Sequence, residues 1–219
     1  MKKSVYSLVL SDEVVAAIDE LAYRQGTSRS NLINQILAEH VSMPTPEKRM
    51  KDIFTAMEEL MDESFQFQLQ PSDSMLSIRS PLRYKYKPTI RYSLELFPAP
   101  GKTFGRLRVS FRTQNEDLID HLIRFFRYFI RMEQHDQAPA LADDSFFSLD
   151  GGRFTRVLRM PAGAGNLSSD ALANGLADYI GIIDSTLKTY FAALDDPRPA
   201  LQSMEKQYQK YLQESSILV

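Results

Sequence analysis

The side chains in this sequence with the clearest chemical potential are basic, and they gather between residues 79 and 112. That stretch holds nine arginines and lysines against a single carboxylate, Glu95. A surface of one sign attracts the phosphates of a nucleic acid or the carboxylates of an acidic protein. Segment 83–87 also alternates basic residues with tyrosines, which could stack on bases or pack on sugars. We assign eight residues to a candidate cationic face: Arg79, Arg83, Lys85, Lys87, Arg91, Arg106, Arg108 and Arg112.

Internal pairing is another interpretation of this cationic face. The arginines could form ion pairs with carboxylates of neighbouring elements of the same chain. An acidic helix surface is available for such docking, made of Glu58, Glu59, Asp62 and Glu63. The sequence therefore leaves three partners open for the cationic face, namely a nucleic acid, an acidic protein and the chain itself.

The carboxylates, histidine and glycine-rich segment that could serve catalysis lack the accompanying residues that a catalytic or metal site requires. The carboxylates at 58–63 could act as acids, bases or metal ligands, but no histidine or glycine-rich loop accompanies them. Asp117 and His121 have helical spacing and could share a metal, yet two weak ligands do not make a site. The glycine-rich segment 161–166 lacks the lysine and the spacing of a phosphate-binding loop. We expect no enzyme, with no catalytic residue, metal or cofactor.

Length and composition indicate an ordinary soluble globular protein. The chain has 219 residues, of which 43% are hydrophobic and 25% charged, enough for one medium domain or two small ones. The absence of cysteine excludes disulfides and thiolate metal sites. No apolar run is long enough for a membrane span, and the start Met-Lys-Lys does not lead into a signal peptide, so we expect a cytoplasmic protein without membrane contact. Because the net charge is −2, any positive surface must be local.

The first forty-one residues have the pattern of one strand followed by two helices. Residues 3–10 are β-prone and alternate between two faces. Ser11 is a natural helix N-cap, and Gly26 suits the left-handed residue after the helix end. Ser28 begins a second helical pattern that runs to about residue 41. So small a unit cannot bury a core alone, which implies a second copy of itself.

The apolar residues of this segment define the core that we expect two copies to share. On the strand they lie at every second position, and on the helices they recur at three- and four-residue spacing. The expected members of this intertwined dimer core are Tyr6, Leu8, Leu10, Val14, Ala17, Ile18, Leu21, Ala22, Leu32, Ile33, Ile36, Leu37 and Val41.

This order and spacing resemble the ribbon-helix-helix DNA-binding family, of the Arc, MetJ and CopG type. The resemblance covers residues 2–42, about a fifth of the chain. As a combination of strand, helix, Gly-x-Ser-x-Ser turn and helix, it is more specific than any of its parts. It is carried by Leu8-Val9-Leu10, Ser11-Asp12-Glu13, Ile18-Asp19-Glu20-Leu21-Ala22, Gly26-Thr27-Ser28-Arg29-Ser30, Leu32-Ile33 and Ile36-Leu37.

The resemblance implies a homodimeric, bacterial-type transcriptional regulator that binds double-stranded DNA. In the family, strands of two protomers pair into an antiparallel ribbon whose exposed face enters the major groove. The resemblance thus implies base reading by Lys3, Val5, Ser7 and Val9. The start of the second helix clamps the DNA backbone in the family, which implies phosphate contacts by Thr27, Ser28 and Arg29.

A non-catalytic interaction protein is the alternative function. Residues 1–41 carry four basic side chains against five acidic ones, and Val5 and Val9 are apolar where the family usually shows polar groups. In this alternative the ribbon-helix-helix only dimerises the protein. The cationic face of the remaining chain then binds a protein partner or a nucleic acid without sequence preference.

The remaining chain predicts a second domain of the α+β class. Pro44 and Pro46 end the second helix, so we expect domains at 1–43 and 47–219 joined by a linker at 44–46. The C-terminal domain should combine an antiparallel sheet with packed helices, and its role could be sensing, oligomerisation or partner binding. The expected strands are 65–70, 75–80, 89–97, 104–112 and 153–160, the expected helices are 47–65, 115–132, 170–194 and 200–215, and 133–152 is an expected loop.

Overall fold

The computed structural model describes residues 5, 7–41, 45–69, 72–85, 87–98, 101–137, 144–160, 167–215 and 217. By its contacts the chain divides into two compact units, residues 1–49 and 50–219. Part of the expected linker, Pro44, lies outside the described residues, as do Lys3, Tyr6 and the glycine-rich segment 161–166.

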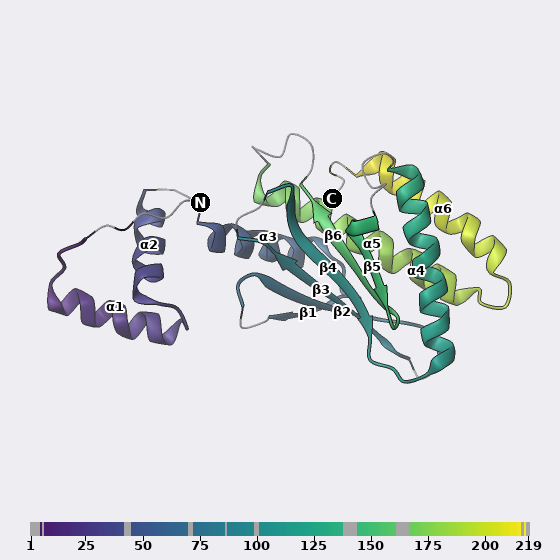
Figure 1. Ribbon diagram of the computed structural model, residues 1–219, viewed down its shortest axis with the longest axis horizontal. Helices are drawn as coiled ribbons and strands as arrows, with labels where there is room; N and C mark the ends of the chain where they lie inside the picture. Colours follow the sequence, from purple (N-terminus) through teal and green to yellow (C-terminus); the bar gives the residue numbers. More distant parts are fainter. Residues whose placement is uncertain are drawn as a thin grey trace. The chain divides into compact units, whose positions relative to one another are not determined.

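The N-terminal unit contains two helices at the predicted places, α1 (Asp12–Arg24) and α2 (Arg29–His40), which cross as a pair (Figure 1). Ser11 caps α1 by accepting a hydrogen bond from the Val14 amide at 3.4 Å. Ser28 caps α2 by accepting one from the Asn31 amide at 3.3 Å. Gly26 has a φ of +63°, a conformation that glycine adopts without a steric penalty. These local signals account for the turn between the helices.

No strand is assigned in the part of residues 3–10 that the structure describes. A β-strand needs a hydrogen-bonded neighbour, and the ribbon expected here would form only between two protomers. The ribbon and the intertwined dimer therefore remain predictions. Within α1 and α2 the single chain buries only Ala22 and Leu32.

A third helix, α3 (Pro46–Leu60), begins where the sequence predicts one but ends five residues before the expected Phe65. Thr45 caps its start by accepting a hydrogen bond from the Lys48 amide at 3.1 Å. At its end, the Asp62 carboxylate accepts a hydrogen bond from the Ser64 amide at 2.8 Å. Such local side-chain bonds compete with helix continuation. The division between the two compact units falls within α3, after Arg49.

The C-terminal unit is built on a six-stranded sheet in which every neighbouring pair is antiparallel, as predicted. Its spatial order is β1-β2-β3-β4-β6-β5. The strands are β1 (Gln66–Leu69), β2 (Met75–Pro81), β3 (Thr89–Leu96), β4 (Thr103–Phe111), β5 (Phe147–Asp150) and β6 (Arg153–Arg159).

The expected loop at 133–152 is wrong in two places. Helix α4 (Glu116–Asp136) continues four residues past Met132, and a short 3-10 turn, η1 (Asp144–Phe146), leads into β5. Gly151 and Gly152 have φ of +52° and +78°, which lets two residues close a hairpin between β5 and β6. The Gly-Gly pair was the available signal for this hairpin, because positive φ at both turn positions favours glycine.

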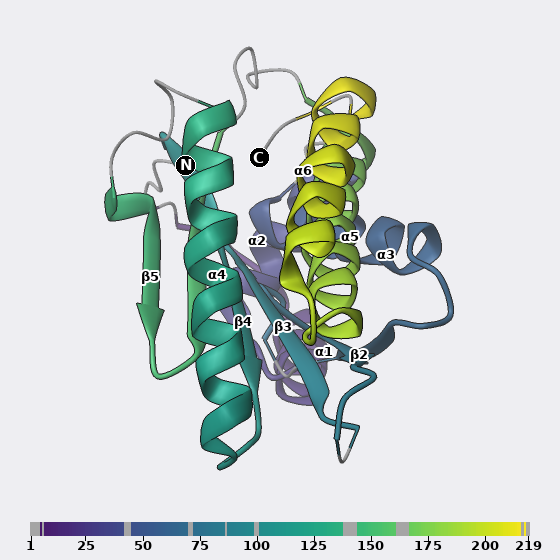
Figure 2. The same ribbon diagram turned by 90° about the vertical axis from the view of Figure 1, so that its right-hand side faces the viewer.

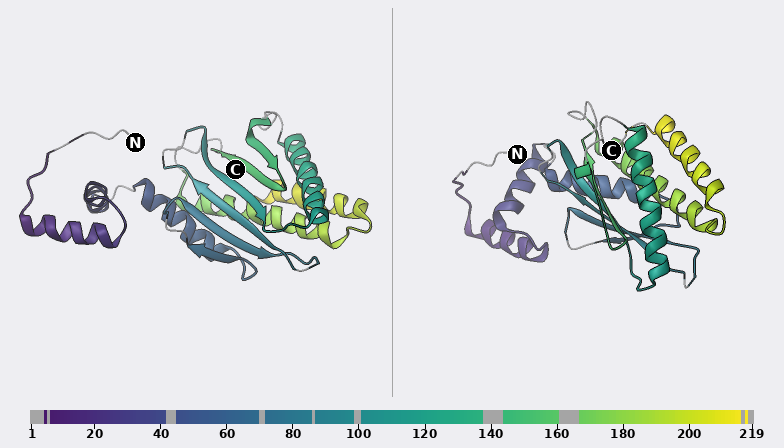
Figure 3. Two further views of the ribbon diagram at one scale, coloured as in Figure 1. Left: turned by 60° about the horizontal axis from the view of Figure 1, so that its bottom comes forward. Right: turned by 45° about the vertical axis from the view of Figure 1, so that its right-hand side comes forward.

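Helices α4, α5 (Ser169–Ala192) and α6 (Pro197–Glu214) lie together on one face of the sheet (Figure 2). Two further views show the same two layers (Figure 3). The alternation of β3 places Ile90, Tyr92 and Leu94 in the core, where they are fully buried. This packing fixes the direction of the remaining strand residues, which point to the opposite face of the sheet.

Candidate nucleic-acid interface

The sheet face opposite the helices carries a set of arginines that strand pairing brings together. Arg79 on β2 lies directly opposite Arg91 on β3, and Arg91 lies opposite Ser110 on β4. Arg106 and Arg108 follow on β4, on the same face. Arg112, one residue beyond β4, is exposed. The expected cationic face thus has five of its eight members on or beside one surface of the sheet.

Strand β6 adds two arginines that the sequence assignment did not include. Because β6 pairs with β4, Arg153 and Arg159 take outward positions beside those of β4. The alternation within 153–159 was visible in the sequence, but the neighbour of the strand was not. We call the outward strand residues Arg79, Arg91, Arg106, Arg108, Arg153 and Arg159 the arginine face.

Glu95 neutralises part of this face. Its carboxylate lies 3.6 Å from the Arg106 guanidinium and 3.8 Å from that of Arg108. These side chains are about one third exposed, so each pair is weak and screened by salt. In the part of the chain that the structure describes, Arg79 and Arg91 have no ion pair. Internal pairing therefore accounts for Arg106 and Arg108 but, among the described residues, not for Arg79 and Arg91.

The basic residues of segment 83–87 lie in the loop between β2 and β3. Arg83, Lys85 and Lys87 are exposed there. Tyr84 does not offer its ring to a base, because it packs edge-on against Phe191, with ring centroids 5.4 Å apart. Tyrosine stacking on bases is thus wrong for Tyr84, while Tyr86 lies outside the described residues.

The residues expected to read bases are exposed, apart from Lys3, which lies outside the described residues. Val5 and Val9 are fully exposed at 100% and 102%, and Ser7 is also exposed. Leu8 and Leu10, expected on the other face of the same strand, are less so at 57% and 39%. The described residues of this segment are thus all exposed in the single chain.

The three residues expected to hold phosphate meet at the start of α2, where all three already have hydrogen-bond partners. The Ser28 hydroxyl caps the helix, and Thr27 Oγ1 accepts a hydrogen bond from the Asn31 side chain at 3.0 Å. Arg29 donates two hydrogen bonds to the carboxylate of Asp19 on α1. These hydrogen bonds lower the pKa of Asp19 and raise the pKa of Arg29, so both stay charged at neutral pH. Arg29 must leave Asp19, or share it, to contact a phosphate.

The N-terminal unit also exposes most of its apolar residues. Of the ten exposed large hydrophobic side chains in the described part of the chain, nine belong to residues 5–41, and the tenth is Leu60. A small soluble unit rarely leaves so much apolar surface uncovered unless another surface packs on it. Eight of the nine were expected on the strand or in the dimer core: Val5, Leu8, Val9, Leu10, Val14, Ile36, Leu37 and Val41.

A buried ion pair inside the C-terminal unit was not predicted. The Arg156 guanidinium donates a hydrogen bond to Glu133 at 3.0 Å, and both side chains are fully buried. The Tyr179 hydroxyl donates to the same carboxylate at 2.9 Å. Burial raises the pKa of Glu133, and Arg156 and Tyr179 work against that shift. The available signal was the parity of Arg156 with Phe154 and Leu158, which are core residues of β6.

This buried group has a structural role. Its charged atoms are closed to solvent, and the Arg156 guanidinium also lies over the Phe147 ring, 4.9 Å from its centroid. A substrate could not reach these atoms without opening the core. The pair therefore serves to join α4 to the sheet rather than to perform chemistry.

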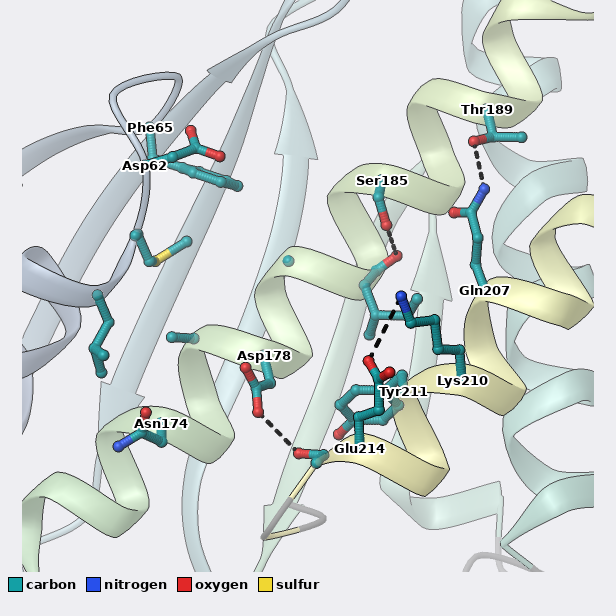
Figure 4. Close-up of a pocket in the computed structure, with 16 residues that line it drawn as sticks. Asp62, Phe65, Asn174, Asp178, Ser185, Thr189, Gln207, Lys210, Tyr211 and Glu214 are labelled. Carbon is teal, nitrogen blue, oxygen red and sulfur yellow. Dashed lines mark hydrogen bonds and ion pairs between the residues drawn. The ribbon is translucent and has the colours of Figure 1, made fainter.

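A groove of about 710 Å³ runs along α5, between α6 and segment 60–65 (Figure 4). On one wall Ser215 donates a hydrogen bond to Asp178 at 3.0 Å. The oxygens Gln207 Oε1 and Tyr211 Oη have no partner with hydrogen-bond geometry, but both are closed to solvent. A ligand in the groove could not contact either oxygen in this conformation, so we assign the groove no ligand.

The fold does not assemble a site from the remaining candidates, which are the Asp117–His121 pair and the carboxylates at 58–63. His121 packs near Tyr84 and Phe191, with centroid distances of 6.4 and 6.2 Å, rather than forming a site with Asp117. Among the described residues there is no group of three potential metal ligands. The acidic side chains at 58, 59, 62 and 63 are exposed, as expected for a solvated surface. None of the helices within the described ranges combines the length and apolarity that crossing a membrane requires.

Comparisons with protein-family models, curated proteins and solved structures found no match to this chain. The resemblance to the ribbon-helix-helix family therefore depends on residues 2–42 alone. Within it, the capped helices and the turn at Gly26 are observed, whereas the paired ribbon is a prediction.

Proposed function

We propose that this protein is a homodimeric transcriptional regulator that binds double-stranded DNA through a β-ribbon formed by residues 3–10 of two protomers. One observation carries the proposal: the N-terminal segment with helices α1 and α2 leaves exposed, in the single chain, the apolar residues that such a dimer would bury. Leu8, Leu10, Val14, Ile36 and Leu37 are 39–57% exposed.

Dimerisation supplies the core that the unit lacks. Burial of apolar surface contributes roughly 25 cal/mol per Å², so covering several leucine, isoleucine and valine side chains supports a stable association. Pairing of two strands would also satisfy the backbone groups of residues 7–10, which have no ladder partner in the single chain. Residues Val5, Ser7 and Val9 then face away from the core, in position for the major groove.

The test for DNA binding uses the purified full-length protein and a pool of random duplex DNA. DNA retained at low salt is sequenced. Recovery of a motif with two-fold symmetry supports the proposal, because a symmetric dimer reads two equal half-sites. Retention without a motif, or no retention, contradicts sequence-specific reading by the ribbon.

The test for dimerisation compares two substitutions on α2. Ile36→Asp places a charge on the expected dimer core, while Asn34→Asp adds the same charge at an exposed polar position of the same helix. Sedimentation should give a dimer for the wild type and Asn34→Asp, and a monomer for Ile36→Asp. A wild-type monomer at micromolar concentration would overturn the proposed dimer.

A second candidate function has support from the ion pair between Arg29 and Asp19. Because Asp19 already holds the expected phosphate ligand, the unit could serve for dimerisation alone. The cationic face would then bind a protein partner or a nucleic acid without sequence preference. Dimerisation without a recovered DNA motif is the result that selects this function.

A further inference from the structure

The arginine face differs from an ordinary solvated sheet surface in its composition. On the outward positions of the described strands it holds six arginines against two carboxylates, Glu95 and Asp150, and no lysine. Lysine would serve equally well for solubility. Arginine differs because its planar guanidinium donates paired hydrogen bonds that match a phosphate group.

Arg79 and Arg91 form the part of this face that no ion pair among the described residues neutralises. The two residues are directly opposite on antiparallel strands, where like charges destabilise the sheet. No carboxylate among the described residues forms an ion pair with either side chain. An anion from outside the chain would relieve this repulsion.

Hydroxyl groups lie in the same rows as the arginines. Arg91 is paired with Ser110, while Arg108 lies between Ser93 on β3 and Thr155 on β6. Serine and threonine hydroxyls donate hydrogen bonds to phosphate oxygens. Rows that combine guanidinium and hydroxyl donors fit a chain of phosphates better than they fit a flat apolar partner.

The aromatic rings beside this face are covered by arginines rather than open to bases. The Arg106 guanidinium lies over Phe97 at 5.9 Å from the ring centroid, and that of Arg159 lies over Phe146 at 5.2 Å. Single-strand binding without sequence preference depends on open aromatic rings that stack on bases. The arrangement thus favours contact with a sugar-phosphate backbone.

We propose that the arginine face binds the phosphodiester backbone of duplex DNA, as a second contact that carries no sequence information. The choice of duplex DNA as the polyanion rests on the function proposed above. The contact adds affinity and salt dependence, whereas sequence reading belongs to the N-terminal unit.

The test compares full-length wild type with Arg79→Gln/Arg91→Gln. The control is Arg127→Gln/Arg131→Gln, which removes two exposed arginines from α4 on the other layer. Affinity for a random-sequence duplex, and for any selected palindromic duplex, is measured over a range of salt. Circular dichroism verifies that both variants are folded.

We expect the Arg79→Gln/Arg91→Gln variant to bind both duplexes less tightly. The slope of log affinity against log salt should become shallower by about 1.8, since each lost phosphate contact accounts for about 0.9. The control should keep the wild-type slope, and the sequence motif should stay unchanged. These results together support a backbone contact at the arginine face.

The outcomes separate this inference from the proposed function. If a motif is recovered but both double variants keep the wild-type slope, the arginine-face contact is overturned and the regulator remains. If no motif is recovered but the slope falls only for Arg79→Gln/Arg91→Gln, the contact stands and sequence-specific reading fails. If the wild type binds no duplex even at low salt, the inference is overturned, and an acidic protein becomes the candidate partner of this face.

Discussion

The Arg29 guanidinium on α2 donates two hydrogen bonds to the carboxylate of Asp19 on α1, ten residues earlier in the chain. The pair joins the two helices at the place where the ribbon-helix-helix resemblance implies a phosphate contact. Both side chains are about half exposed, so the pair adds little stability. Its larger consequence concerns DNA, because Asp19 and a phosphate compete for one guanidinium.

Asp19→Asn should therefore strengthen DNA binding. The substitution weakens the interaction of residue 19 with Arg29, which frees the guanidinium for a phosphate. The slope of log affinity against log salt should therefore steepen by about 0.9, the value for one phosphate contact. Glu20→Gln is the matched control, because it removes one carboxylate from the adjacent exposed position. Equal changes in the two variants would mean that only net charge matters and that Arg29 is not a phosphate ligand.

Glu133→Gln should destabilise the C-terminal unit. It removes the carboxylate that Arg156 binds in the core, and loss of one partner of a buried ion pair costs about 3–5 kcal/mol of unfolding free energy. Replacing both residues, with Glu133→Gln and Arg156→Met, should cost less than the single change. Urea unfolding followed by circular dichroism gives both values, and a single variant as stable as wild type would contradict this account.

Arg156→Met should make stability depend on pH in the acid range. Burial raises the pKa of Glu133, and loss of Arg156 removes a charge that opposes the shift. A raised pKa in the folded state means that stability is full below the unfolded pKa and falls as pH rises through the folded one. The stability deficit relative to wild type should thus grow from pH 4 to neutral pH. The double variant, which lacks the buried acid, should show no such growth.

Alkaline pH should unfold the C-terminal unit through its buried tyrosines. Burial raises the pKa of Tyr92, Tyr179, Tyr208 and Tyr211, and Asp184 adds to the shift at Tyr92. Because these pKa values exceed those of the unfolded chain, stability is full below about pH 10 and falls above it. Tyrosinate absorbance from these residues should appear together with loss of helical circular dichroism. Their ionisation before unfolding would contradict their burial.

Gly105→Ala should destabilise the sheet beside Glu95. A Cβ at residue 105 of β4 would lie 2.7 Å from the carbonyl oxygen of Glu95 on β3. Gly105 also borders the register shift in the pairing of β4 with β6. Relieving such overlap requires backbone movement and costs about 1–3 kcal/mol. Gly101→Ala is the control, because a Cβ there meets no atom within 4 Å. Thermal unfolding should show a lower midpoint for Gly105→Ala only.

Local patterns in the sequence determined the elements and much of the composition of the sites. Ser11, Ser28 and Gly26 specify where α1 and α2 begin and turn, because caps and left-handed turns depend on a few neighbouring residues. Alternation along β3 and β4 likewise predicted one apolar and one basic face, since side chains of a strand point to opposite sides. The antiparallel sheet and the α+β class followed from these patterns.

Tertiary structure alone decided which of these faces meet. Pairing of β6 with β4 extends the arginine face by Arg153, and packing of α4 on the sheet encloses Arg156 with Glu133. It also turns Tyr84 toward Phe191 and away from any base. Strand order and helix packing depend on contacts between residues far apart in the chain, which short-range periodicity does not encode. The sequence thus determined most of the elements and their faces, while the fold added β5 and decided which charged side chains lie together.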